Sequence, residues 1–302
     1  MRIKLENNGL PSVKPEGNGL ASFGQSHRQS HRPEGRGLPS IRQSHRPKKR
    51  LGQNFLRDEN IQRKIIGVLG LEPSDVVLEI GAGRGELTGL IAPKVNKIYA
   101  LEIDKQLCPF LTERFKVFNN VRIINQDILK FDLAKISGRG FKIKVIGNIP
   151  YYISSPIIEY LIKYRAWISE VFITVQKEFA GRVVAVPGSK EYGSFSCFVQ
   201  YYAVPKIMFQ INKGCFYPSP KVDSCLLRLK VREKPAVCVR DEELFFKVIR
   251  AAFNQRRKTL RNSLKDKIPF PKLECFFFKN KLNPNVRPEE LSLKDFASLV
   301  RK

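Results

Sequence analysis

The stretch Val76-Val77-Leu78-Glu79-Ile80-Gly81-Ala82-Gly83-Arg84-Gly85-Glu86 decides the fold class of this chain. Its first half is a mostly apolar run of strand length, which is typical of a strand buried on both faces in a parallel sheet. Three glycines follow, and then Leu87 and Leu90 at helical spacing. A strand, a glycine turn and a helix in this order predict an α/β fold. Because glycines allow close backbone approach, a ligand is expected at the turn, near Gly81 and Gly83.

Two further strands are predicted downstream, and acidic residues follow both. Lys97–Ile103 delivers Glu102, which lies 21 residues beyond Gly81, a reach that suits ribose hydroxyls. Val121–Asn125 delivers Asp127, which could accept a hydrogen bond from an adenine amine. The glycines are spaced more tightly than in dinucleotide-binding motifs, which favours a nucleoside without pyrophosphate. Together these residues suit S-adenosylmethionine, although a helix cap and a loop acid are the structural alternatives for the two carboxylates.

Asn148-Ile149-Pro150-Tyr151 follows the mostly apolar run 143–146, which we predict to be a buried strand. Open α/β sheets bind ligands at the carboxyl ends of their strands. The Asn148 side-chain carbonyl and a backbone carbonyl at Ile149 or Pro150 can accept hydrogen bonds from an exocyclic amine. The Tyr151 ring can stack on the base that carries this amine. The alternative is a strand-ending turn, where Asn, Pro and Tyr are all ordinary residues.

Further helices and strands are expected up to residue 235, and Phe216 lies in a loop between two of these strands. The Phe216 ring could cover the second face of an extruded base or fill a hydrophobic gap. The sequence weighs these two roles equally. The expected helices begin after Asp58, at Ser154 and at Gln176, and the expected strands are 171–175, 206–211 and 224–231.

Pro235 marks a boundary, and helices are expected from Asp241 onward, the last from Pro288 to Leu299. One continuous helix face is predicted from polar residues at steps of three and four: Lys247, Arg250, Asn254, Arg257 and Arg261. The apolar residues opposite are Phe245, Ile249, Ala252 and Phe253. We interpret this basic face, together with Arg256 and Lys258, as a surface that contacts phosphates. The alternative is a face that is only solvated.

Composition predicts an intracellular protein that binds a polyanion. The 54 Lys and Arg residues exceed the 28 Asp and Glu residues by 26, a charge that favours nucleic acid as partner. No run approaches the ~20 apolar residues of a membrane span, and no secretory signal is recognised. We interpret the six scattered cysteines as reduced core thiols rather than disulfides or a zinc site. A cytoplasmic monomer without a metal is expected.

Residues 1–47 consist of short imperfect repeats and are predicted to be disordered. Gln-Ser-His-Arg occurs at 25–28, 29–32 and 43–46, and these copies contain all three histidines, His27, His31 and His45. The histidine spacing follows the repeat rather than a metal site. The expected organisation is therefore a tail at 1–47, a ligand-binding domain at 48–235 and a helical domain at 236–302.

Over about residues 48–302, these motifs resemble those of the ribosomal RNA adenine N6,N6-dimethyltransferase family of the small-subunit, KsgA type. The resemblance is carried by Gln53-Asn54-Phe55-Leu56, Leu78-Glu79-Ile80-Gly81-Ala82-Gly83, Glu102-Ile103-Asp104, Gly147-Asn148-Ile149-Pro150-Tyr151, Gln176-Lys177-Glu178, Tyr192-Gly193-Ser194, Phe216 with 218–224, and Arg256-Arg257-Lys258-Thr259-Leu260. It implies a Rossmann-like methyltransferase domain and a small all-helical C-terminal domain that binds RNA. It also implies S-adenosylmethionine contacts at Asn54, Leu56, Gly81, Glu102, Asp127 and Asn148. The repeat tail departs from the family's pattern.

What the resemblance implies for function is methylation of two adjacent adenosines in a small-subunit rRNA hairpin near the 3′ end, late in ribosome assembly. One alternative is a large-subunit rRNA adenine methyltransferase of the macrolide-resistance type. Another is an assembly factor that binds the immature small subunit and whose methylation is incidental. A DNA adenine methyltransferase is less favoured, because nothing resembles a sequence-reading module. The segments 192–194 and 256–258 favour the small-subunit enzyme.

Overall fold

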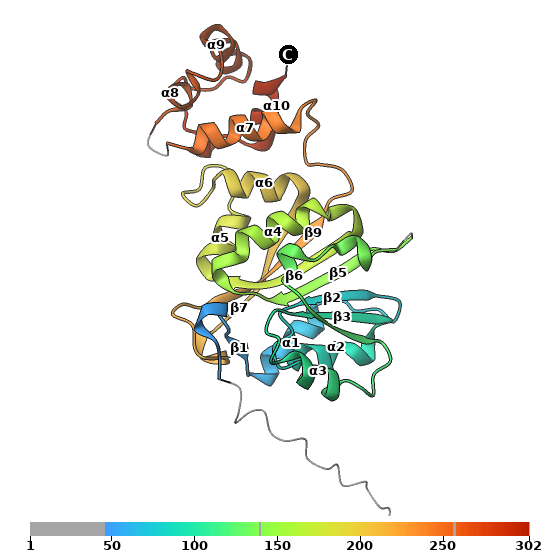
Figure 1. Cartoon of the computed structure of the whole chain (residues 1–302). Coiled ribbons are helices and arrows are strands. Elements are labelled where there is room, and N and C mark those ends of the chain that lie inside the picture. Colours follow the sequence, from blue (N-terminus) through green and yellow to red (C-terminus); the bar gives the residue numbers. More distant parts are fainter. Residues whose placement is uncertain (1–45, 139, 256–257, 302) are drawn as a thin grey trace, which may run out of the picture. The chain divides into compact units, whose positions relative to one another are not determined.

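A computed structural model describes residues 46–138, 140–255 and 258–301 (Figure 1). Of the predicted tail, residues 1–45 with the three histidines lie outside the described residues, as do Arg256 and Arg257 of the predicted basic face. All the elements below belong to the unit Arg46–Lys302. Residues 46–302 form one compact unit by their contacts, which does not separate a domain at residue 235. The boundary near residue 235 therefore stays a prediction.

A seven-stranded sheet with the order β4-β3-β2-β5-β6-β9-β7 forms the centre of this unit. Its strands are β2 (Val76–Ile80), β3 (Lys97–Glu102), β4 (Val121–Asn125), β5 (Ile143–Asn148), β6 (Ile168–Gln176), β7 (Ala203–Ile211) and β9 (Ser224–Val231). The strands from β4 to β6 pair in parallel, and β9 is antiparallel to both of its neighbours. The strand order reverses between β2 and β5, the position at which such sheets bind ligands.

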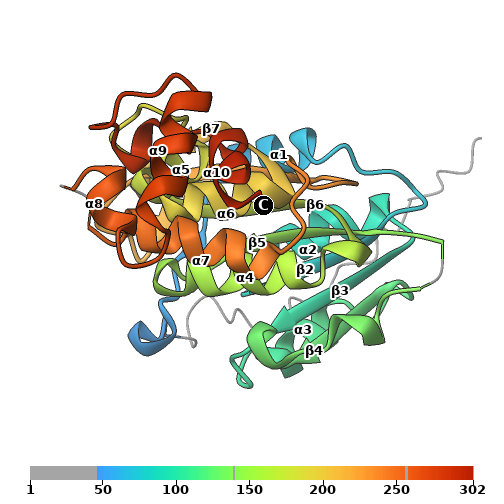
Figure 2. The same cartoon turned by 90° about the horizontal axis from the view of Figure 1, so that it is seen from above.

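Helices cover both faces of the sheet, which explains why β2 is buried along its length (Figures 1 and 2). One face carries α1 (Glu59–Val68), α2 (Glu86–Ile91) and α3 (Cys108–Arg114), and the other carries α4 (Ser154–Lys163), α5 (Lys177–Val184) and α6 (Ser194–Tyr202). Val76, Leu78 and Ile80 belong to one buried cluster, whereas Val77 belongs to another. The predicted α/β class and the Asp58 helix cap are confirmed.

The strand predicted from the apolar run 143–146 continues to Asn148, which places this residue at the carboxyl end of β5, as predicted. All six cysteines are free, but Cys238 and Cys275 are exposed, so the core interpretation is wrong for these two.

The C-terminal segment is helical, as predicted, but its elements are shorter than expected. They are α7 (Glu242–Phe253), α8 (Leu260–Leu264), α9 (Phe270–Lys279) and α10 (Leu293–Val300). The prediction of one continuous face over 247–261 is wrong, because α7 ends at Phe253 and the Thr259 side chain caps a new helix at Leu260. The predicted last helix also divides, into a 3-10 turn, Pro288–Glu290, and α10 with Ser292 as its N-cap.

The first helix of this segment packs on the sheet domain through aromatic residues. The hydroxyls of Tyr201 and Tyr202 in α6 donate to the two carboxylate oxygens of Glu242, at 3.1 and 2.6 Å. Phe245 is buried against the Tyr201 ring, with 5.3 Å between centroids. Within the described ranges, every helix is too short or too polar to cross a lipid bilayer.

Candidate active site

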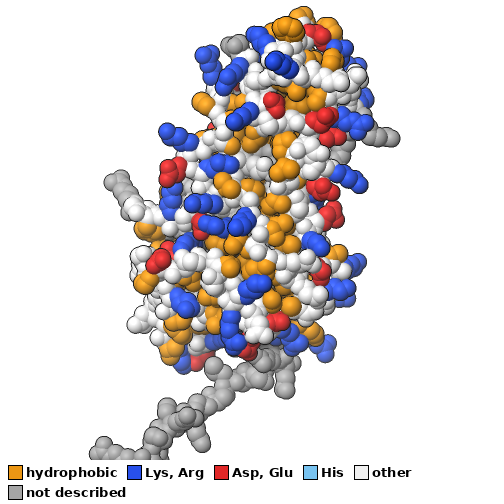
Figure 3. Space-filling view, turned by 180° about the vertical axis from the view of Figure 1, so that it is seen from behind, with side chains coloured by type: hydrophobic (Ala, Val, Ile, Leu, Met, Phe, Trp, Pro, Cys, Tyr) orange, Lys and Arg blue, Asp and Glu red, His pale blue; other side chains and the backbone are white. Residues whose placement is uncertain are grey.

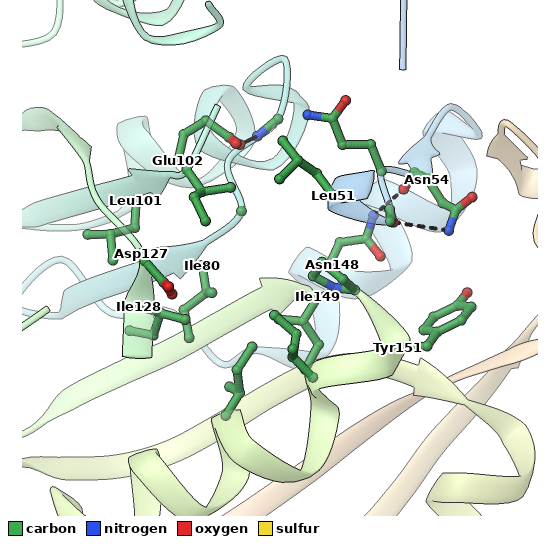
Figure 4. Close-up of a pocket in the computed structure, with 18 of the residues that line it drawn as sticks. Leu51, Asn54, Ile80, Leu101, Glu102, Asp127, Ile128, Asn148, Ile149 and Tyr151 are labelled. Atoms are coloured by element: carbon green, nitrogen blue, oxygen red, sulfur yellow. Dashed lines mark hydrogen bonds between the residues drawn. The ribbon is translucent and has the colours of Figure 1, made fainter. Parts of the chain in front are cut away.

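A pocket lies at the carboxyl ends of β2 and β5, where the strand order reverses (Figure 4). It comprises about 820 Å³, open mouth included. Its walls come from five regions of the sequence, namely 51–55, the glycine turn after β2, the ends of β3 and β4, and the segment 148–153. Gly81, Gly83, Glu102, Asp127 and Asn148 all line it. The sheet topology therefore brings together the residues that the sequence analysis selected.

The glycine turn forms the floor of the pocket beside β3. Gly83 has a φ of 60°, in the left-handed region that favours glycine. A Cβ atom there would lie 3.2 Å from the Phe55 ring. The backbone nitrogens of Gly81 and Ala82 both donate to the Leu101 carbonyl, at 2.9 and 3.0 Å. The turn is thus fixed to β3 while its backbone stays open to a ligand.

Glu102 is a rigid acceptor on the wall of this pocket. The residue is 4% exposed, and its Oε2 and Oε1 accept from the backbone nitrogens of Gly83 and Asp104, both at 2.8 Å. Burial raises the pKa of the carboxyl, and the two N–H donors oppose that rise. Each carboxylate oxygen can accept a second hydrogen bond. The side chain can therefore receive two hydroxyl donors from a ligand without releasing the turn.

Asp127 stands at the end of β4, next to an apolar wall. Its Oδ1 accepts from the backbone nitrogen of Leu129 at 3.0 Å and so caps the 3-10 turn Ile128–Lys130. The helix-cap interpretation is thus correct for one oxygen, but the residue also lines the pocket. Ile80, Leu101 and Ile128 surround it in Figure 4, and all three are buried. An apolar slot with a carboxylate at its rim suits a flat ring that carries an amine.

Asn148 is held by the segment that precedes β1 (Phe55–Leu56). Its Nδ2 donates to the backbone oxygen of Asn54 at 2.7 Å, which leaves Oδ1 as the acceptor of the amide (Figure 4). The preceding residue is Gly147, where a Cβ atom would lie 2.9 Å from the Ile80 carbonyl oxygen. A glycine at this position therefore lets β5 approach the end of β2 and places Asn148 beside the glycine turn.

Tyr151 lies beyond Asn148, in the 3-10 turn Tyr151–Ile153. Its hydroxyl shares a 2.5 Å hydrogen bond with the Oγ of Ser224, a fully buried residue at the start of β9. Burial raises the pKa of the phenol, so the ring is neutral at physiological pH. The anchored hydroxyl fixes the ring at the wall of the pocket.

The segment before β1 also belongs to the site. The sequence analysis predicted only Asn54 in this segment. Leu51, Gly52 and Gln53 line the pocket. Lys48 Nζ pairs with Asp104 Oδ1 at 2.6 Å, and Gln53 Nε2 donates to Oδ2 at 3.1 Å. Burial alone would raise the pKa of Asp104, but hydrogen bonds from Lys48, Gln106 and Gln53 lower it below its ordinary value. The one available signal was the proximity of these residues to Asn54 in the sequence.

Two predicted site residues lie outside the pocket. Leu56 and Phe216 are paired in the small antiparallel sheet of β1 and β8 (Phe216–Tyr217), and both are 4% exposed. They belong to a hydrophobic cluster with Ile65, and neither lines the pocket. Phe216 therefore fills a hydrophobic gap, which is one of the two roles that the sequence left open. The Leu56 side chain is also buried, and it borders a smaller cavity next to Gly81, Gly83 and Asn148.

The described residues of the predicted basic surface are not among those that line the pocket. Lys247 and Arg250 are exposed on α7, and Lys258 is exposed between α7 and α8. Arg261 instead pairs with Glu274 and lies over the Phe270 ring, 5.1 Å from its centroid. Arg261 is thus engaged within the helical segment rather than freely presented.

A second buried carboxyl lies behind the glycine turn. Glu79 in β2 is buried, and its Oε2 accepts from the Thr88 hydroxyl at 2.5 Å. Burial raises the pKa of this carboxyl to about 8, against the opposing effect of the Thr88 hydrogen bond. In the described part of the chain, no three His, Cys, Asp or Glu side chains gather in a way that could hold a metal ion.

Comparison with known proteins gives the family. Residues 44–302 match the ribosomal RNA adenine dimethylase family. A protein of Caldanaerobacter subterraneus named ribosomal RNA small subunit methyltransferase A is 46% identical over 258 residues, covering 84% of this chain and 96% of the relative. A protein of Streptococcus agalactiae with the same name is 43% identical over 263 residues, covering 84% of this chain and 90% of the relative.

Solved structures agree with this result. A dimethyladenosine transferase from Plasmodium falciparum has a TM-score of 0.69 at 28% identity, over 82% of this chain and 96% of that one. The 23S rRNA methyltransferase ErmE has a TM-score of 0.66 at 24% identity, over 82% of this chain and 98% of that one, and this likeness shows the fold alone. With a Rossmann-like methyltransferase fold and a match from residue 44 to its end, the chain belongs to the ribosomal RNA adenine dimethylase family and is an rRNA adenine dimethyltransferase.

Proposed function

We propose that this enzyme transfers methyl groups from S-adenosylmethionine to N6 of two adjacent adenosines in a small-subunit rRNA hairpin near the 3′ end. The observation that carries the proposal is the fixed amide of Asn148. Its Nδ2 is engaged by Asn54, so its Oδ1 is the acceptor at the pocket that also contains Glu102 and Asp127. We further propose that it acts as a cytoplasmic monomer on the immature small subunit.

The residues present fit the methyl donor. The second lone pairs of the Glu102 oxygens would receive the two ribose hydroxyls, and Asp127 would accept from the adenine amine over the apolar slot. The backbone at Gly81, Gly83 and Asn54 would contact the remainder of the ligand. When bound, S-adenosylmethionine supplies an electrophilic methyl group on a sulfonium. The acceptor amine is the difficult partner, because its lone pair is delocalised into the purine ring.

Asn148 would make this amine more nucleophilic by orienting it. Hydrogen bonds from the two N6 protons to Asn148 Oδ1 and to a backbone carbonyl direct the nitrogen lone pair out of conjugation and into the pocket. The second acceptor is the backbone carbonyl of Ile149 or of Pro150; the Pro150 carbonyl also accepts from the Ile153 nitrogen at 3.2 Å and can accept once more. Tyr151 would stack on the extruded base, a contact that contributes about 1–3 kcal/mol.

The charge of the protein supports an extended contact with RNA. Figure 3 shows Lys and Arg side chains spread over a whole face, with Asp and Glu between them. We propose that Lys247, Arg250 and Lys258 contact phosphates, together with Arg256 and Arg257, which lie outside the described residues. Arg261 contributes less directly, because its guanidinium is paired with Glu274.

The experiment that tests the proposal maps the methylated nucleotides. Small subunits and large subunits that lack N6,N6-dimethyladenosine are incubated separately with the enzyme and the methyl donor, and each rRNA is read by primer extension. We expect reverse transcription to stop at two adjacent adenosines of the small-subunit rRNA, because dimethylation blocks Watson–Crick pairing. Stops in the large-subunit rRNA alone would favour the large-subunit alternative, and an absence of stops would reject the proposal.

An assembly role independent of methylation is the second candidate, and it is tested separately. An Asn148→Ala variant that restores small-subunit assembly in cells that lack the enzyme would favour that role. We expect the variant to leave the rRNA unmethylated, so the two readouts separate binding from catalysis.

A further inference from the structure

Tyr152 is an exposed aromatic residue at the pocket. Its neighbour Tyr151 has its hydroxyl bonded to Ser224, whereas Tyr152 lines the same pocket and is 66% exposed. Among the described pocket residues, Ile103 is the other exposed large apolar side chain, at 49%. An exposed ring gains apolar burial when another surface covers it. Tyr152 thus has a surface to offer a substrate.

The Tyr152 ring is supported on one side. Gly52 has a φ of 60°, and a Cβ atom there would lie 3.1 Å from Cε1 of Tyr152 and 3.1 Å from Cβ of Pro150. The ring therefore packs closely against the backbone of Gly52, in the segment that Lys48 and Gln53 fix to Asp104. The remainder of the ring faces solvent. A ring held in this way loses little further conformational freedom when a base stacks on it.

We propose that Tyr152 stacks on the nucleobase next to the adenosine that occupies the pocket. The inference rests on the proposed function, because extrusion of one adenosine separates the neighbouring base from its stacking partner. Tyr151 and Tyr152 follow one another in one 3-10 turn, so two consecutive aromatic residues face a substrate with two consecutive bases. When either adenosine is in the pocket, Tyr152 receives a base beside it and keeps the strand in register.

The test compares Tyr152→Ala with Tyr152→Phe, which retains the ring. Phe141→Ala is the matched control, because Phe141 is 42% exposed and precedes β5, at the opposite edge of the sheet from the pocket. The substrate is an RNA hairpin with two adjacent adenosines. Companion hairpins carry an abasic nucleotide, or the fluorescent base 2-aminopurine, on either side of the target adenosine.

We expect Tyr152→Ala to lower kcat/KM for the hairpin about tenfold and to leave donor affinity unchanged, and Tyr152→Phe and Phe141→Ala to resemble wild type. The difference in kcat/KM between wild type and Tyr152→Ala should disappear on one of the two abasic hairpins. On that hairpin the base that stacks on Tyr152 is missing, so neither enzyme can gain from it. In binding experiments, wild type should quench 2-aminopurine at that position, and Tyr152→Ala should not.

An equal penalty on all hairpins, or equal quenching by wild type and Tyr152→Ala, would overturn the inference. Failure of the wild-type enzyme to methylate both the unmodified hairpin and undermethylated small subunits would instead reject the proposed function. The quenching measurement needs no methyl transfer, so it decides the role of Tyr152 in that case too.

Discussion

Replacing Glu102 by Gln tests how the methyl donor is bound. Both carboxylate oxygens accept backbone N–H groups at 2.8 Å, one from Gly83 and one from Asp104. A glutamine has one oxygen, so its NH2 group must face one of these donors in either orientation. The buried N–H left without a partner destabilises the glycine turn by about 1–3 kcal/mol. The native fold should persist, because the side chain keeps its size.

The effect on donor binding should be comparable to this local loss. A ribose hydroxyl that donates to the carboxylate loses a charge-assisted hydrogen bond of about 1.5–3 kcal/mol, which corresponds to roughly 10- to 150-fold in the dissociation constant. Isothermal titration calorimetry with S-adenosylmethionine and with its demethylated product measures this directly. Glu72→Gln is the control, because Glu72 is exposed and precedes β2 at the other edge of the sheet. Donor affinity within twofold of wild type, in a variant that is fully folded at the assay temperature, would refute the ribose assignment.

Three further predictions concern stability and RNA binding. The pKa of Glu79 is 4.5 ordinarily and about 8 in the folded protein, so folding binds a proton between these values and stability falls as the pH rises through 8. Glu79→Gln should remove a decline on the order of 2 kcal/mol between pH 6 and 8.5 in urea unfolding, and a parallel decline in both proteins would contradict this. Gly147→Ala should lower the free energy of unfolding by about 1–3 kcal/mol and reduce methyl transfer, because its Cβ would lie 2.9 Å from the Ile80 oxygen. Gly67→Ala in α1 is the control: its Cβ would meet nothing within 4 Å, so it should not destabilise the protein. Lys247→Ala with Arg250→Ala should weaken RNA binding at low salt and reduce the slope of log K against log salt by about 1.5, and an unchanged slope in fluorescence anisotropy would exclude phosphate contact.

Local patterns were enough to predict the part of the site at the ends of β2, β3, β4 and β5. The strands are short apolar runs, and the polar residue that follows each run is automatically at the carboxyl edge of a parallel sheet. Glu102, Asp127 and Asn148 line the pocket for this reason. Their proposed roles in donor and amine binding stay predictions until they are measured.

Pairings between distant residues account for what the sequence could not predict. Phe216 is buried because β8 pairs with β1, far away in the chain, and no local pattern distinguishes this from an exposed loop. Similarly, the pocket-lining residues Leu51, Gly52 and Gln53 are held in place because Lys48 and Gln53 both bond to Asp104. The helix predicted over 247–261 failed for a local reason, since the regular spacing of basic residues continues across a break that Thr259 caps.

The pocket as a whole depends on Asn148, and one variant tests its role most directly. Methyl transfer by Asn148→Ala is measured in a single turnover on undermethylated small subunits, alongside the affinity for S-adenosylmethionine. Asn120→Ala is the control, because the Asn120 amide donates only to backbone oxygens of Ala92 and Val95, outside the pocket. We expect Asn148→Ala to abolish methyl transfer and to weaken donor binding only modestly, while Asn120→Ala keeps its turnover. Near-normal turnover by Asn148→Ala would show that this amide does not orient the acceptor amine.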